Sequence, residues 1–254
     1  MTTRHYPVLL LTLACACLVP VAGRAQTVDD VVARHLAARG GLDRIRAIQS
    51  LRMTGRATTN GESPALITRE VQRPGRIRIE LSYQGVTAAY VSDGESGWQV
   101  SPFDGSLDPE PMAPEQMQVA RDQSDIDGPF VDSTAKGLRV ELAGRAPLDG
   151  RDAYKLKVTT KDGAVRHHYV DAVSHLLVRS ETTRPVRGRM TNVETTFSDY
   201  REVAGVMFPH AIETGASGRA TRMRIVVDRV EVNPPLDAAR FRAPEGLGAA
   251  PVKR

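Results

Sequence analysis

The chain has 254 residues, and its 34 Lys and Arg side chains against 30 Asp and Glu give a formal net charge of +4. The arginines are scattered singly among acidic residues without aromatic platforms between them, which argues against a nucleic-acid-binding surface. Both cysteines, Cys15 and Cys17, lie near the start of the chain. The remainder therefore needs a hydrophobic core rather than disulfides for its stability.

Residues 1–25 have the pattern of a secretory signal peptide. Arg4 precedes an apolar run over residues 8–19, and Gly23 and Ala25 occupy the −3 and −1 positions of an A-x-A-like cleavage site. The apolar run is shorter than the about 20 residues that a membrane-spanning helix needs. We therefore expect a periplasmic protein, and export argues against ATP- or NADH-dependent chemistry.

Cys17 raises the alternative of an outer-membrane lipoprotein. An acylated cysteine needs Leu at the third position before it with small residues between, whereas the three residues before Cys17 are Ala, Cys and Ala. This match is poor, so we expect simple cleavage before Gln26.

The mature chain, residues 26–254, is long enough for one large β domain or two small ones, and we expect a single domain.

The mature chain begins with a predicted helix. Thr27 is suited to an N-cap, with Asp29 and Asp30 in the first turn, and apolar residues follow at helical spacing. The pair at residues 40–41, both glycine, predicts the end of this helix. A second short helical turn is expected over residues 42–48.

From residue 51 onward the apolar residues alternate with polar ones, which predicts strands with one apolar and one solvated face. Turn signals such as Asp93-Gly94 and Asp149-Gly150 separate these strands. Between Val227 and Val230 the parity of the alternation changes, which predicts a bulge. About eleven strands, mostly antiparallel neighbours, are expected, and the clearest cover residues 51–57, 76–81, 138–142, 154–158 and 223–232.

The alternation disappears over residues 109–136, approximately. Pro114 and Glu115 can open a helix, and the D-G-P sequence at residues 127–129 breaks it. The expected order is therefore a helix, about five strands, a helical insertion and about six strands. A sheet with one apolar face must cover that face, and the first helix and the insertion are the material available to do so.

The sequence contains no visible catalytic or metal-binding motif. His167 and His168 are neighbours on a predicted strand, so they point to opposite faces and are poorly placed to share a metal. Asp122, Asp125 and Asp127 resemble part of a calcium loop but lack the Glu at its twelfth position. There is no G-x-S-x-G, phosphate loop or dinucleotide fingerprint. We therefore expect a binding protein rather than an enzyme, without metal or cofactor.

Three segments in order resemble the LolA-like carriers that take lipoproteins across the periplasm. V-Q-R-P at residues 71–74 precedes an apolar strand, V-S-D-G at residues 91–94 precedes Trp98 and P-F, and L-D-A-A-R-F at residues 236–241 precedes Pro244 and Gly246. Residues 101–111 and 206–210 resemble the longer outer-membrane lipoprotein-sorting relatives. The resemblance implies a strongly curved, incomplete antiparallel β-barrel covered by an N-terminal helix and the helical insertion.

The resemblance also implies a function. Such a carrier holds the acyl chains of a lipoprotein or lipid in an apolar cavity, because each methylene exposed to water costs about 0.8 kcal/mol. It would act as a monomer between an inner-membrane donor and an outer-membrane acceptor protein. Two alternatives remain, namely a periplasmic lipid-sensing module that signals through a membrane partner, and an extracytoplasmic hydrolase.

Individual roles follow from the same resemblance. Arg73 matches the family's arginine that hydrogen-bonds the lid, so we expect a lid latch whose acceptors are helix-end carbonyls of the insertion. An ordinary strand-end arginine is the alternative. For each residue proposed to line the cavity the alternative is an ordinary core position, and these residues are Ile77, Ile79, Leu81, Trp98, Met112, Met117, Ile126, Phe130 and Val131.

Overall fold

The structure, a computed structural model, describes residues 2, 26–186 and 188–242. The expected signal peptide and the motif residues Pro244 and Gly246 lie outside the described residues. The helices are α1 (Val28–Ala38), α2 (Leu42–Ala47) and α3 (Pro114–Ser124), with 3-10 turns at Pro102–Asp104 and Ala238–Phe241. The strands are β1 (Ser50–Thr59), β2 (Ala65–Gln72), β3 (Arg76–Tyr83), β4 (Val86–Ser92), β5 (Gly97–Ser101), β6 (Ser106–Pro111), β7 (Arg139–Leu148), β8 (Arg151–Thr159), β9 (Val165–Asp171), β10 (Leu177–Val186), β11 (Arg189–Val203), β12 (Val206–Ala216) and β13 (Arg222–Val232).

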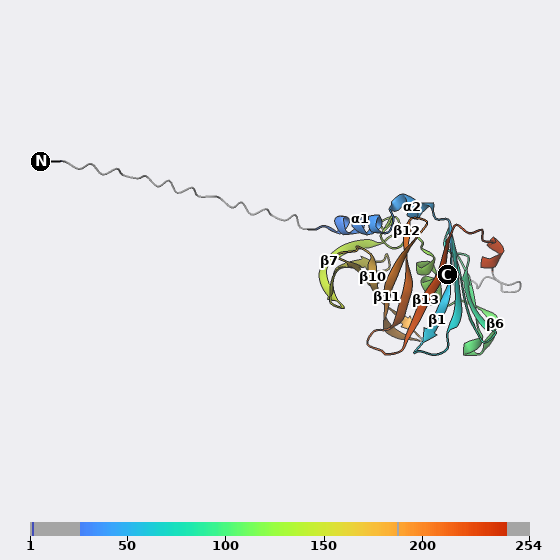
Figure 1. Ribbon diagram of the computed structural model, residues 1–254. Helices are drawn as coiled ribbons and strands as arrows, with labels where there is room; N and C mark the ends of the chain where they lie inside the picture. Colours follow the sequence, from blue (N-terminus) through green and yellow to red (C-terminus); the bar gives the residue numbers. More distant parts are fainter. Residues whose placement is uncertain (1, 3–25, 187, 243–254) are drawn as a thin grey trace.

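In the described part of the chain, 13 strands form one antiparallel sheet with the order β6-β5-β4-β3-β2-β1-β13-β12-β11-β10-β9-β8-β7. The first and last strands, β1 and β13, pair in the middle of the sheet. β6 and β7 form its two edges, so the sheet curves without closing, and α1 and α2 lie at one end of it (Figure 1). The prediction of a curved, incomplete antiparallel barrel is confirmed.

The described sheet has two strands more than the eleven or so expected from the alternation. β6 is one of the strands that the sequence hides, because it carries Pro109 and Pro111 and lies where a helical insertion was expected to begin. Proline is tolerated there because an edge strand needs hydrogen bonds on only one side. The helical part of the insertion is consequently shorter than residues 109–136 and begins at Pro114.

The predicted bulge lies in β13. Thr54 of β1 pairs with Arg229, whereas Gly55 pairs with Val227, so Asp228 is the extra residue. A side chain at Gly55 would place its Cβ 2.2 Å from the carbonyl oxygen of Val226, so this crossing requires glycine. The bulge moves Val227 and Val230 to the same face of the sheet, as the change of parity indicated.

Helix α1 begins and ends as predicted. The Thr27 hydroxyl accepts a hydrogen bond from the Asp30 amide (3.2 Å), and the Asp30 carboxylate accepts one from the Thr27 amide (3.0 Å). Gly40, with φ +116°, follows the helix, and a Cβ there would lie 2.0 Å from the Gly205 carbonyl oxygen. No helix of the described residues is long and apolar enough to cross a membrane.

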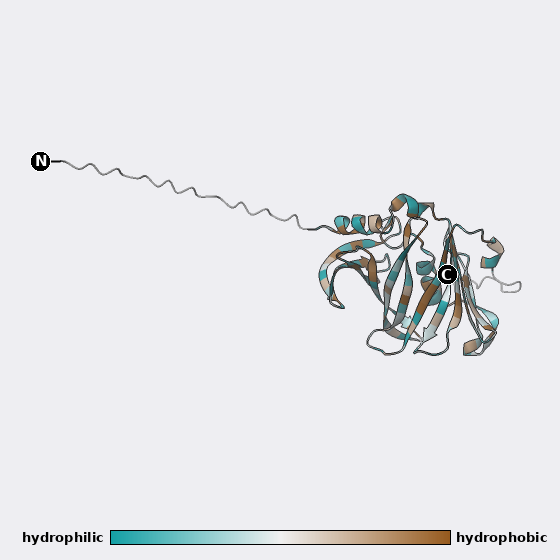
Figure 2. Cartoon of the chain, viewed as in Figure 1, coloured by the Kyte–Doolittle hydropathy of each residue, from teal (hydrophilic) through white to brown (hydrophobic). Residues whose placement is uncertain are grey.

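The two faces of the sheet carry separate hydrophobic clusters. Figure 2 shows apolar and polar residues alternating along the strands. On the concave face, one cluster joins Leu51, Val71 and Ile77 to residues of α2 and α3. A second cluster joins Leu156 and its neighbours on β8 and β9 to α1. On the convex face, a smaller cluster is covered by the C-terminal 3-10 turn.

Trp98 belongs to this convex cluster, so its predicted place in a cavity on the concave face is wrong. Strand register puts Arg78, Val91 and Trp98 in one row on the convex face, opposite to the face of Ile77. The indole packs with Phe241 and donates a hydrogen bond to the Arg242 carbonyl (2.9 Å). Arg78 lies over its ring, with the guanidinium carbon 5.8 Å from the centroid.

Trp98→Ala should therefore destabilise the fold by opening the convex cluster. Its side chain is 9% exposed, and truncation of a buried aromatic residue costs about 3–5 kcal/mol. Chemical denaturation of the mature chain measures the loss of unfolding free energy. Leu107→Ala, at a position that is 77% exposed, is the control and should change stability by less than about 0.5 kcal/mol. Equal stability of the two variants would contradict this placement of Trp98.

Candidate functional site

Helix α3 and the following loop, residues 125–132, lie across the concave face, and we call this segment the lid. Pro114 opens the helix, and the Gln116 side chain accepts a hydrogen bond from the Ala113 amide (2.8 Å). Met117, Ala120 and Ser124 form the buried side of α3 and follow its helical spacing. The remaining side is polar, so the helix has one apolar stripe suited to covering the sheet.

The apolar stripe of the lid packs on the β3 side of the sheet. Ile126 and Ala120 join the cluster that contains Ile77, and Ile79 and Met112 pack against it. Met117 is 8% exposed and lies near Gly97 on β5, where a side chain would collide with its sulfur. The structure therefore brings five of the predicted lining residues into contact or proximity. With the lid in this position, they pack together as a core between the lid and the sheet.

Phe130 and Val131 occupy a different place from the rest of the predicted lining. Both are buried, and Phe130 belongs to the cluster that joins α1 to β8 and β9. Leu81 lies on the concave face but outside the lid cluster, and it is half-buried. With Trp98 on the convex face, the predicted lining is divided between the lid cluster, the cluster beneath α1, a half-buried part of the concave face and the convex face.

Beside the lid, the concave face carries two rows of apolar residues, which we call the apolar rows. Strand register defines both, because residues paired across neighbouring strands share a face. Except for Val227, which is buried and belongs to the lid cluster, their larger side chains are only half-buried, in contrast to those beneath the lid. One row consists of Ala88, Leu81, Ile67, Gly55 and Val227, and the other of Ala65, Ala57, Ile225, Ile212 and Phe197.

Arg73 contacts the lid through a carboxylate. Its guanidinium donates two hydrogen bonds to Asp127, of 2.7 and 2.6 Å, and one of 2.7 Å to the Ile48 carbonyl. The expected acceptors were helix-end carbonyls of the insertion, but the carbonyls that Arg73 reaches belong to the α2 end of the fold. The bonds from Arg73 hold the pKa of Asp127 below its ordinary value.

Four further arginines of the described residues also bind the lid. Arg39 donates to the Asp127 carbonyl (2.7 Å), and Arg69 donates to the Gln123 carbonyl. Arg166 of β9 pairs with Asp122 (2.8 Å), and the exposed Arg46 pairs with Asp132 (2.8 Å). The lid is therefore held by apolar contacts on one side and by cationic donors from several elements around it.

Arg69 lies outside the motifs of the sequence, but its place in β2 is a signal of its own. In β2, Ile67 and Val71 point to the concave face, and Arg69 stands between them in the same alternation. A charged residue at an apolar position of a strand needs a partner. That partner lies 54 residues further along the chain, so only the folded arrangement identifies it.

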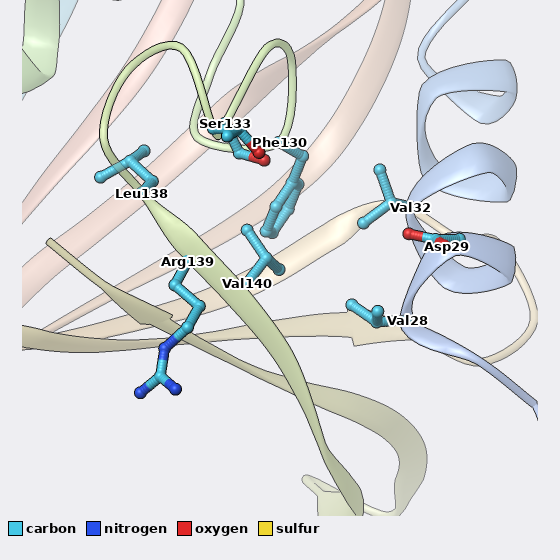
Figure 3. Close-up of a pocket in the computed structure, with 9 residues that line it drawn as sticks. Val28, Asp29, Val32, Phe130, Ser133, Leu138, Arg139 and Val140 are labelled. Carbon is cyan, nitrogen blue, oxygen red and sulfur yellow. The ribbon is translucent and has the colours of Figure 1, made fainter.

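A pocket of about 420 Å³ lies between α1 and the start of β7. Figure 3 shows Val28 and Val32 of α1 on one side, Phe130 of the lid in the middle and Val140 of β7 opposite. Its volume falls within the range of small-ligand sites. Polar groups also line it, including Asp29 and Arg139. It opens at one free edge of the sheet, beside the lid loop.

Two buried histidines surround Phe130. Their ring centroids lie 5.2 Å (His35) and 5.5 Å (His168) from that of Phe130, both edge-on. Burial lowers the pKa of His35 to about 4 and that of His168 to about 3. His35 contacts the His175 carbonyl through Nδ1 (2.9 Å), whereas neither ring nitrogen of His168 has a hydrogen-bond partner among the described residues. His167 lies on the opposite face, as predicted.

No family model and no curated protein matches the sequence. Solved structures do match the fold. A DUF1329 family protein from Desulfovibrio piger has a TM-score of 0.59 at 13% identity, over 85% of this chain and 97% of that one. A LolA superfamily protein from Nitrosomonas europaea has a TM-score of 0.54 at 15% identity, over 86% of this chain and 99% of that one.

A domain described as an outer-membrane lipoprotein-sorting protein, from Vibrio parahaemolyticus, has a TM-score of 0.56 at 11% identity, over 84% of this chain and 94% of that one. These likenesses confirm the predicted LolA-like fold. At such identities they establish the fold alone, so the function rests on the geometry of the concave face.

The two buried histidines should make stability fall in acid. Their pKa values are lower in the folded than in the unfolded chain, so the stability is complete above about pH 6.5 and is lost as the pH falls towards 4 and 3. His168→Leu should reduce the loss of unfolding free energy between about pH 8 and about pH 5 by about 2 kcal/mol. His167→Leu, on the convex face, should reduce it less. An unchanged pH profile for His168→Leu would contradict this assignment.

Proposed function

We propose that this protein is a periplasmic carrier that binds the acyl chains of a lipid or lipoprotein on its concave face and delivers them toward the outer membrane. The apolar rows carry this proposal, because they present half-buried Ile67, Leu81 and Ile225 along one continuous face. The LolA-like fold supports it. The structural similarity to the Vibrio parahaemolyticus domain, which is described as an outer-membrane lipoprotein-sorting protein, also supports the proposal.

With the lid in place, the larger side chains of the apolar rows stay half-buried while neighbouring apolar residues are covered by α3. Displacing α3 would add Ile77, Ile79 and Val71, now packed in the lid cluster, to the binding surface. The transfer of apolar surface out of water is worth about 25 cal/mol per Å². An acyl chain would therefore replace the apolar stripe of α3 on the sheet, and Met112 and Met117 would adapt to it because methionine is flexible.

The charged contacts suit a lid that opens and closes. Arg73 and Asp127 are both partly accessible to water, with side chains 29% and 13% exposed. When the lid opens, water can satisfy both groups, and when it closes they bind each other again. In this proposal the contact favours the closed, empty state and so favours release of the ligand, which the protein would receive from an inner-membrane donor and pass to an outer-membrane acceptor.

Acyl binding on the apolar rows predicts that Ile67→Gln weakens binding of a fluorescent fatty acid by about tenfold, equivalent to about 1.4 kcal/mol. A polar side chain there would be buried under the acyl chain without a partner. Leu66→Gln is the matched control on the same strand, since Leu66 points to the convex face and is 64% exposed. Titration of delipidated protein measures both affinities. Absence of binding to the wild-type protein at micromolar concentration would refute the carrier proposal.

The latch proposal predicts that Arg73→Leu and Asp127→Asn load ligand but release it slowly. Hydrogen bonds to charged groups contribute about 1.5–3 kcal/mol, so release should slow by a factor of about 10 to 100. Transfer of a bound fluorescent lipid to acceptor vesicles measures the rate. Arg46→Gln is the control, because its pair with Asp132 is exposed at both ends, with side chains 50% and 54% exposed. Release at the wild-type rate by both lid variants would remove the latch from the mechanism.

A further inference from the structure

Three arginines from opposite parts of the sheet converge on the C-terminal end of α3. Arg69 of β2 donates to the Gln123 carbonyl, and Arg166 of β9 pairs with Asp122 at 2.8 Å. Arg184 of β10 lies within electrostatic range of the same carboxylate. Five strands lie between β2 and β9 in the sheet, so the curvature of the sheet brings these side chains together beneath the lid.

The closed lid leaves two of these cations, Arg69 and Arg184, under-satisfied. A guanidinium has five N–H donors. Arg69 uses one group on Gln123 and another on the Met53 sulfur (3.9 Å), and its Nε is buried without a partner among the described residues. Burial lowers the pKa of Arg69 to about 10. Within the described chain, no hydrogen bond or ion pair is found for Arg184, whose pKa burial also lowers.

The position of Arg69 relates this cluster to the apolar rows. Ile67 of the first apolar row precedes it on the same face of β2, and Ile79 lies opposite it on β3. Arg69 therefore lies beside the middle of this row, between Met53 and Ile79 in the neighbouring row, so a head group projecting sideways from a chain on the apolar row would meet the Arg69 guanidinium. When the lid lifts, Asp122 and Gln123 leave with it, and the three arginines lose their only lid acceptors in the described structure.

We propose that Arg69, Arg166 and Arg184 bind the oxyanion at the head of an acyl ligand, a carboxylate or a phosphate, once the lid has moved. In the closed state the Asp122 carboxylate and the Gln123 carbonyl occupy the acceptor position that the oxyanion would take. The inference rests on the proposed function and narrows its ligand class to anionic amphiphiles. Arginine suits this role because its planar donors match carboxylate and phosphate oxygens in pairs.

The site explains why the lid presents an acid and a carbonyl at this end. A buried cation without an acceptor is costly, so the empty protein needs a substitute for the ligand's charge. The exchange of acceptors is reversible, because the Asp122 carboxylate and the Gln123 carbonyl bind the arginines again when the ligand leaves. An uncharged ligand would displace the same lid without giving the arginines an acceptor, so it should bind less well.

Matched ligand pairs test this inference on the delipidated mature protein. Palmitate is compared with hexadecanol, and lysophosphatidate with monoacylglycerol, each by displacement of a fluorescent acyl probe. The wild-type protein should prefer the anionic member of at least one pair by about tenfold or more, and this preference should weaken as salt is added. The pair with the larger preference identifies the headgroup as a carboxylate or a phosphate.

Variants separate the charge effect from folding. Arg69→Met and Arg184→Gln should each reduce the preference while leaving the affinity for the uncharged ligand unchanged or higher, which also shows that the variants are folded. Arg56→Gln is the control, because Arg56 pairs with Asp228 and its side chain is 55% exposed. Equal affinities for both members of both pairs in the wild-type protein would overturn this inference alone. Failure of all four ligands to bind would overturn the proposed function and this inference with it.

Discussion

A curved sheet that is apolar on its inner face and does not close has to be covered, and this requirement determines the rest of the structure. The edges β6 and β7 remain apart, so the inner face cannot be buried against itself as in a closed barrel. Among the described residues only α1, α2 and the lid are available to cover it, and they leave the apolar rows half-buried. The feature that makes the fold incomplete is therefore also the feature that leaves an apolar face for the proposed ligand.

The means by which the lid is held follow from the same requirement. A lid attached only by apolar side chains would lose all of its stabilisation when exposed to water. Here the loop end is fastened by Arg73 and Arg39 to Asp127, and the helix end by Arg69 and Arg166. Arg73 and Asp127 are partly exposed and can be hydrated when separated, so opening at this end exposes less unfavourable surface than the size of the lid would indicate.

Local features could be predicted from the sequence, whereas contacts between distant strands could not. The N-cap at Thr27 and the bulge before Val230 depend on neighbouring residues and were predicted correctly. Trp98 was assigned to the wrong face because β5 is short and its face depends on its register with β4. The position of Arg73 in a motif indicated that it contacts the lid, but the identity of its partner, Asp127, depends on the path of the lid across the sheet.

The convergence of Arg69 and Arg166 shows most clearly why part of the site was beyond sequence reasoning. Arg69 interrupts an apolar alternation on β2, which signals a buried partner but does not say where it is, whereas Arg166 carries no such signal because His168 follows it on the same face of β9. Their common target appears only when strands on both sides of β1 and β13 curve around the same helix. In the proposed carrier, lid and ligand compete for this one face, so every contact that stabilises the closed lid lowers the affinity for the ligand by the same free energy. The affinity of such a carrier is thus set as much by its lid as by its binding surface.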